Sequence, residues 1–110
     1  MSQLINTPTP PYYAVIFTSI LSSDDADYHA MADRMIEQVA QQEGFLGFES
    51  ARDDVGITVS YWEDEAAIRR WKDDVEHQTA QQQGKSRWYD AYTIRIAKVE
   101  REYRFERTAP

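Results

Sequence analysis

The sequence predicts an α+β fold of the ferredoxin-like type, in which two helices cover one face of an antiparallel sheet in the order βαββαβ. Three observations predict it: an apolar strand-like stretch near the start, two helical patterns with a pair of short strand patterns between them, and a long alternating stretch near the end. With 110 residues the chain suits one hydrophobic core and leaves no room for a second domain.

The first elements follow from local composition. Residues 1–11 hold three of the four prolines and predict a flexible N-terminal tail, so that the single domain spans residues 12–107. The stretch YYAVIFTSI, residues 12–20, is rich in β-branched and aromatic residues and predicts a strand covered on both faces. An amphipathic helix is predicted next, stopped by Gly44 and with an apolar face formed by Tyr28, Met31, Ala32, Met35 and Val39.

The second half repeats the alternation of strands and helix. FLGFESAR and GITVSYW predict two strands joined by a turn of the hairpin type. A helix over residues 63–72 is expected to place Ala67, Ile68 and Trp71 on one face, with Asp64 as its N-cap. Residues 73–84 are polar and predict a short extra helical turn.

The last predicted strand is unusually long. Residues 89–105 alternate between two faces, which exceeds the length of an ordinary strand. A strand too long for its own sheet leaves an exposed edge, and a second copy of the chain can pair with it. We therefore expect a homodimer.

Charge and composition exclude several classes of partner. The net charge of −7 disfavours binding to nucleic acid or to an anionic membrane surface. Residues 85–107 are locally basic, which suits an anionic ligand or a neighbouring subunit. The absence of cysteine excludes disulfides, thiolate catalysis and cysteine-bound zinc. It also fits a cytoplasmic location. The same location is expected because the start does not resemble a signal peptide and no apolar run has membrane length.

Several spaced features resemble the antibiotic biosynthesis monooxygenase family of dimeric α+β barrels. They are GFLGFES at the entry to the second strand, VSYW at the end of the third, and the segment from Trp71 through His77 to Gln81 before the long final strand. The similarity runs from about Tyr12 to about Phe105. It implies a homodimer whose sheets face one another, with a pocket in each subunit between sheet and helices. Members of the family include cofactor-independent monooxygenases that act on phenolic or quinol-like aromatics, and haem-degrading enzymes.

Aromatic residues supply the candidate substrate-binding site. Trp62, Trp71, Trp88 and Tyr92 are predicted to line a flat cavity in which an aromatic ring can stack. The alternative is that they are core residues, since large aromatic side chains dominate the cores of small domains.

Two polar residues are the candidate catalytic groups. His77 can titrate near neutrality and remove a phenolic proton. The alternative is a solvated histidine beside Asp73 and Glu76, which is commonplace on a helical turn. Arg95 can hold a developing oxyanion, or it can form an ion pair across the dimer.

No metal or cofactor is expected. His29 has Asp25 and Asp33 at helical spacing, but such a trio more often surrounds a solvated histidine than a metal ion. The resemblance implies that the axial histidine of haem-degrading relatives falls at Gln81, which is a poor iron ligand. No glycine-rich phosphate loop for a nucleotide cofactor is present.

The sequence thus predicts a cofactor-independent monooxygenase that oxidises a small phenolic or quinol-type aromatic with dioxygen. A non-catalytic dimeric module that binds a small ligand or responds to stress is the alternative, and haem binding or degradation is a third.

Overall fold

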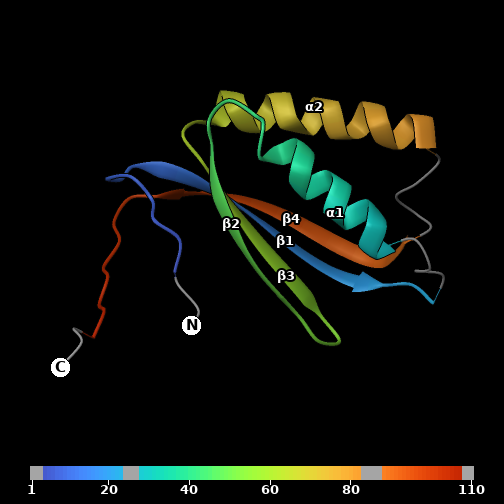
Figure 1. Ribbon diagram of the computed structural model, residues 1–110, viewed down its shortest axis with the longest axis horizontal. Coiled ribbons are helices and arrows are strands. Elements are labelled where there is room, and N and C mark those ends of the chain that lie inside the picture. The colour runs from blue at the N-terminus through green and yellow to red at the C-terminus, as the bar shows by residue number, and fades with distance from the viewer. Residues whose placement is uncertain (1–3, 24–27, 83–87, 108–110) are drawn as a thin grey trace.

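The computed structural model describes the side chains of residues 4–23, 28–75 and 88–107, and the backbone of residues 76–82 as well. The predicted βαββαβ order is confirmed (Figure 1). The elements are β1 (Tyr12–Leu21), α1 (Tyr28–Val39), β2 (Phe45–Arg52), β3 (Gly56–Trp62), α2 (Glu65–Gln82) and β4 (Tyr89–Val99).

The four strands form one antiparallel sheet in the order β2-β3-β1-β4. The central strand β1 pairs with β3 on one side and with β4 on the other. The prediction that β1 is covered on both faces is met on one face only, because the helices pack on the side of Tyr13 and Val15. β2 and β4 form the two edges.

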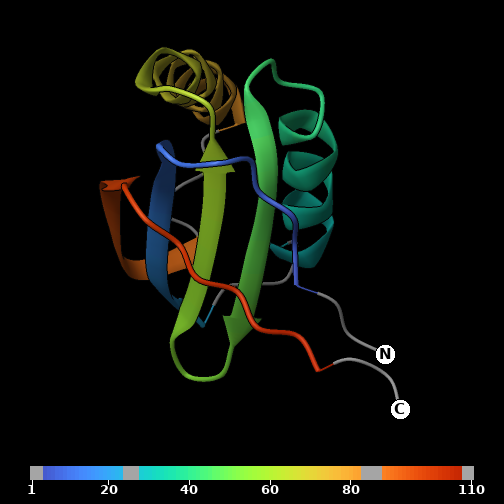
Figure 2. The same cartoon turned by 90° about the vertical axis from the view of Figure 1, so that its left-hand side faces the viewer.

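The sheet has two unlike faces. Tyr13 and Val15 pack against the core that includes residues of both helices, so we call their side the helix face. Because neighbouring strand residues point to opposite sides, Tyr12 and Ala14 lie on the other side, which we call the open face. Figure 2 looks at the open face, where the two terminal segments cross in front of β3 and β2.

The hydrophobic core occupies one end of the helix face. Its centre is Trp62, whose side chain has no exposed surface and whose ring meets that of Phe45 edge to face at 5.3 Å. Val39 of α1 and Ala67 and Ile68 of α2 complete its buried residues. The core therefore joins both helices to the ends of β2 and β3.

Two local features fix the start of α2 against this core. Asp64 is confirmed as the N-cap, since its Oδ1 accepts a hydrogen bond of 2.8 Å from the backbone N of Ala67. Gly44 has a φ of +88°, and a Cβ built there would lie 2.7 Å from the Cβ of Ala67. Only glycine tolerates both the backbone conformation and the close approach to α2.

Two elements differ in length from their sequence predictions. The turn expected over residues 73–84 is part of α2, which continues as one helix to Gln82. The final strand is shorter than its alternating pattern, since β4 ends at Val99. Val99 pairs with Tyr12, the first residue of β1, and the prolines before Tyr12 cannot extend the ladder.

Candidate active site

The end of the helix face away from the core carries a group of aromatic rings. Phe17 of β1 lies 5.5 Å from the ring of Tyr89 and 5.4 Å from that of Tyr92. Tyr28, the first residue of α1, meets Tyr89 edge to face at 5.9 Å. We call these four residues the tyrosine cluster.

A β-bulge assembles this cluster. Residues 89 and 92 are three apart, so in a regular strand their side chains would point to opposite faces. The pairing of β4 with β1 shifts between Ile20 and Leu21, so that Leu21 pairs with Tyr89 while Ile20 pairs with Ala91. The extra residue reverses the alternation and brings both tyrosine rings together at 5.7 Å.

Arg52, the last residue of β2, brings a positive charge to the cluster. Its guanidinium donates to the backbone O of Ser19 at 3.4 Å and also to the Ser19 Oγ, and Ser19 is buried. The Cζ of Arg52 lies 5.7 Å from the centre of the Tyr28 ring, within range of a cation–π contact.

The route of Arg52 across the sheet depends on Gly56. The two residues are paired across the β2–β3 hairpin, and a Cβ at Gly56 would collide with the guanidinium of Arg52. The missing side chain therefore lets the guanidinium cross β3 and reach Ser19 on β1. Gly56, at the start of β3, therefore has a packing role, because it allows the Arg52 guanidinium to approach the backbone closely.

The hydroxyl of Tyr89 stays protonated at neutral pH. Burial raises its pKa above the ordinary value of 10.0, the neighbouring Tyr28 raises it further, and the positive charge of Arg52 partly opposes both effects. The cluster thus holds the neutral phenol of Tyr89, which can donate a hydrogen bond, and the guanidinium of Arg52.

The cluster is reachable from the β4 side. Tyr92 is 41% exposed, and Ile94 and Ile96, which follow it on the helix face, are 50% and 51% exposed. A flat aromatic ligand can approach over these side chains and stack on the tyrosine rings.

Comparison with known proteins identifies the family. Residues 11–83 match the family model of the antibiotic biosynthesis monooxygenases. The chain belongs to the antibiotic biosynthesis monooxygenase family. It is 50% identical to the uncharacterised protein YqjZ of Bacillus subtilis over 108 residues, which cover 96% of this chain and 95% of YqjZ.

Solved structures share the fold of this monooxygenase family member at low sequence identity. SnoaB, a cofactor-independent oxygenase from Streptomyces nogalater, is 15% identical, with a TM-score of 0.62, and the match covers 89% of this chain and 100% of SnoaB. Protein SO0527 from Shewanella oneidensis is 12% identical, with a TM-score of 0.68, and the match covers 87% of this chain and 95% of SO0527.

The four aromatic residues predicted for substrate binding do not form one group. Trp62 is fully buried and donates from Nε1 to the Oγ of Ser60 at 2.9 Å, and the half-buried Trp71 packs against the same core. Trp88 is buried just before β4. Only Tyr92 belongs to the tyrosine cluster.

The two predicted catalytic residues lie apart from that cluster or outside the described side chains. Arg95 pairs with Ile16, so it lies on the open face, on the other side of the sheet from Tyr92. His77 falls within α2, and its side chain lies outside the described residues, as does that of Gln81.

Sequence reasoning missed Tyr28, Tyr89, Arg52 and Ser19. Tyr28 was assigned only to a helix face, and the bulge that turns Tyr89 toward Tyr92 leaves no sequence signal. A signal for Arg52 did exist, because an arginine paired with a glycine across a short hairpin can lie over that glycine. The structure also brings the exposed His29 to the edge of the cluster, 5.5 Å from the Tyr28 ring.

The described residues form neither a cluster of metal ligands nor a helix that could span a membrane. Among the residues that the structure describes, no three histidine, aspartate or glutamate side chains converge as metal ligands, and Asp25 lies outside that part of the chain. Within the same described ranges, neither helix is long and apolar enough to cross a bilayer.

Proposed function

We propose that the protein is a cofactor-independent monooxygenase that oxidises a small phenolic or quinol-type aromatic at the tyrosine cluster. The observation that carries this proposal is the guanidinium of Arg52, held by Ser19 beside the Tyr28 ring in a chain of the monooxygenase family. A cation fixed beside an aromatic-lined surface stabilises the anion that this reaction requires. SnoaB, which shares the fold, is a cofactor-independent oxygenase.

The proposed reaction draws its electrons from the substrate. A base removes a proton from the substrate, and the resulting carbanion, stabilised as a phenolate or enolate, transfers an electron to dioxygen. The two radicals combine into a peroxide anion on the ring carbon. The base returns its proton to this anion, and the hydroperoxide loses water. At an anthrone-type carbon the methylene becomes a carbonyl, so one oxygen atom enters the product and the other leaves as water.

The proposal assigns proton removal to His77. It gives no contact with a substrate at the tyrosine cluster to Arg95, which lies on the open face, or to Trp71 and Trp88, which are packed away from the exposed rings. His29 is a second candidate base, because its ring already contacts Tyr28. The chain has only these two histidines, so paired substitutions separate the two assignments.

Oxygen uptake by the purified chain tests the proposal. The substrates are a panel of hydroquinones and anthrones, and the variants are His77→Ala and His29→Ala. Uptake that depends on the protein and falls in His77→Ala supports the assignment, whereas a fall only in His29→Ala moves the base to α1. No uptake above buffer with any substrate would overturn the monooxygenase proposal.

One observation favours a non-catalytic module that binds a small aromatic. The tyrosine cluster is open along β4, where Tyr92 is 41% exposed, whereas a carbanion needs protection from water. Saturable binding of the aromatic without oxygen uptake would establish this second function.

The proposal includes a homodimer formed through the open face. A sheet normally needs a second layer over each apolar face, and Ile20 and Ile57 on the open face are 45% and 46% exposed. Proteins of this family are typically small and dimeric. A second copy laid on the open face would provide the missing layer and leave the helix face free for the substrate.

A further inference from the structure

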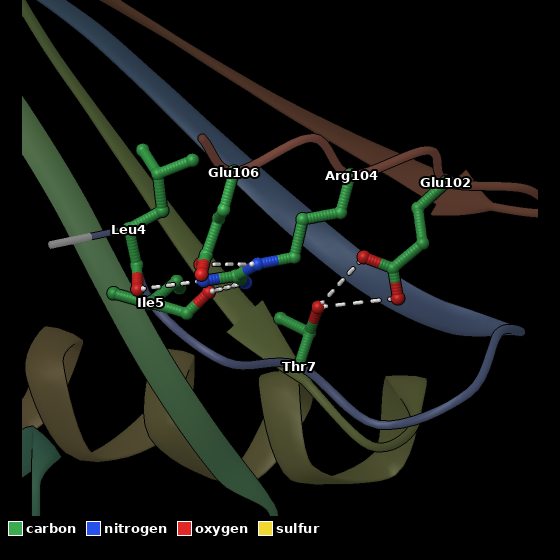
Figure 3. Close-up of polar contacts among 6 residues, drawn as sticks. All are labelled: Leu4, Ile5, Thr7, Glu102, Arg104 and Glu106. Carbon is green, nitrogen blue, oxygen red and sulfur yellow. Dashed lines mark hydrogen bonds and ion pairs between the residues drawn. The ribbon is translucent and has the colours of Figure 1, made fainter. Parts of the chain in front are cut away.

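The two terminal segments are bound to each other. They lie almost entirely outside residues 11–83, which match the family model. Arg104 donates to the backbone O of Ile5 at 2.9 Å and to that of Leu4 at 3.4 Å (Figure 3). Glu102 accepts a hydrogen bond of 3.0 Å from the Thr7 hydroxyl and one of 3.3 Å from the Tyr12 hydroxyl. These contacts fix the direction in which residues 100–107, which we call the C-terminal arm, leave the sheet.

The C-terminal arm exposes two aromatic rings. Tyr103 is 87% exposed and Phe105 is 78% exposed, while Arg104 between them faces the N-terminal segment. Figure 1 shows the arm leaving the end of the sheet, and Figure 2 shows it crossing in front of β3 and β2. An arm whose direction is fixed by hydrogen bonds but whose rings are exposed is typical of a segment that contacts another chain.

The opposite end of the open face carries an apolar hollow of about 170 Å³. Ile20, Val55 and Ala91 are among its lining residues, and Val55 is 46% exposed. A cavity of roughly 150 Å³ accommodates a benzene ring, so this hollow has room for the ring of Phe105 or Tyr103.

We propose that the C-terminal arm of one copy inserts Tyr103 or Phe105 into the hollow of a second copy, and that the second copy does the same in return. The proposal rests on the homodimer proposed above and specifies which residues hold it together. A two-fold dimer repeats each contact, so a ring at one end of the face and a hollow at the other end are self-complementary.

The orientation follows from the positions of the two parts. The arm leaves one end of the open face, and the hollow lies at the other end. Only an arrangement with the β1 strands of the two copies antiparallel brings the arm of each copy to the hollow of the other.

Sedimentation velocity over a dilution series of the full chain tests the contribution of the arm. We expect the double variant Tyr103→Ala/Phe105→Ala to raise the dimer dissociation constant about tenfold or more, since burying one large aromatic ring changes an equilibrium constant by that order. Ile36→Ala, which truncates an exposed side chain on α1, is the matched control and should leave the constant unchanged. Circular dichroism verifies that each variant is folded.

Disulfide trapping tests the location, because the chain has no cysteine of its own. Phe105→Cys and Val55→Cys are made in separate chains, mixed and oxidised, with Phe105→Cys and Ile36→Cys as the control pair. A crosslinked heterodimer from the first mixture alone supports the proposal. Two results would overturn the proposal but leave the homodimer standing. In the first, the arm variant has the same dimer dissociation constant as the wild-type chain. In the second, the wild-type chain is dimeric but the first pair does not crosslink. A wild-type chain that is monomeric at every concentration overturns both the proposal and the homodimer.

Discussion

The Trp62 core and the tyrosine cluster lie at opposite ends of the same helix face, and both are built from aromatic rings. In the core, the Trp62 indole is wholly buried and its N–H is bonded to Ser60. In the cluster, Tyr92 is 41% exposed and a guanidinium lies beside the rings. Aromatic content therefore does not distinguish a core from a site in this chain, whereas exposure and fixed charge do.

The largest expected effect comes from breaking the core. Trp62→Ala should lower the free energy of unfolding by about 3–5 kcal/mol, because it removes a buried ring and leaves a cavity. Thermal unfolding followed by circular dichroism measures this loss. Tyr92→Ala at the exposed edge of the cluster should cost much less, and an equal loss for both would contradict the distinction between the two ends.

Removing the charge from the cluster should affect activity far more than stability. Arg52→Gln should lower the oxidation rate about 10²-fold, since that is the order of loss when one oxyanion-stabilising donor is removed. Its free energy of unfolding should change by about 1 kcal/mol or less, because Arg52 is largely exposed. Arg69→Gln on the exposed surface of α2 is the control, and a similar loss of rate there would refute a specific role for Arg52.

Weakening the helix cap should affect only the core end. Asp64→Ala should cost about 1 kcal/mol of unfolding free energy, because it removes the acceptor for the backbone N of Ala67. Asp64→Asn retains an acceptor and should recover most of the loss in a denaturant titration. Binding at the cluster should not change in either variant, and a coupled loss of binding would show that the two ends are not independent.

The smallest effect is a dependence of stability on alkaline pH. Burial, followed by the hydrogen bond to Glu49, raises the pKa of Tyr61 to about 12, and burial and Tyr28 raise that of Tyr89 above 10.0. Because their pKa values are higher in the folded state, Tyr61 and Tyr89 contribute stability that is fully present below pH 10. This contribution is lost as the pH rises further, because the unfolded chain then binds fewer protons than the folded one. Tyr89→Phe should flatten the decline in denaturant titrations above pH 10, and an unchanged decline in this variant would show that Tyr89 does not cause it.

Local signals in the sequence predicted most of the fold. The strand patterns of β2 and β3 and the Asp64 cap depend on neighbouring residues, and the structure has them where they were expected. The end of β4 was not predictable from its own alternation, which continues to Phe105. It depends on where β1 begins, at Tyr12, and so on pairing between distant segments.

The candidate site was harder to predict because it depends on register. Alternation assigns Tyr89 and Tyr92 to opposite faces, and only the bulge in β4 brings them together. Arg52 reaches Ser19 across Gly56 from a different strand. Trp62 and Trp71 lie near one another in the sequence, but that proximity marks the core.

Chemical-shift mapping by nuclear magnetic resonance would show directly whether an aromatic ligand binds at the tyrosine cluster. The labelled protein is titrated with a small hydroquinone under anaerobic conditions, so that binding is observed without oxidation. Binding at the cluster predicts saturable shifts of the Tyr28, Tyr89 and Tyr92 ring signals and of Arg52, with little change at Trp62. Shifts confined to the open face, or no saturable shift in the cluster, would show that the ligand does not bind there.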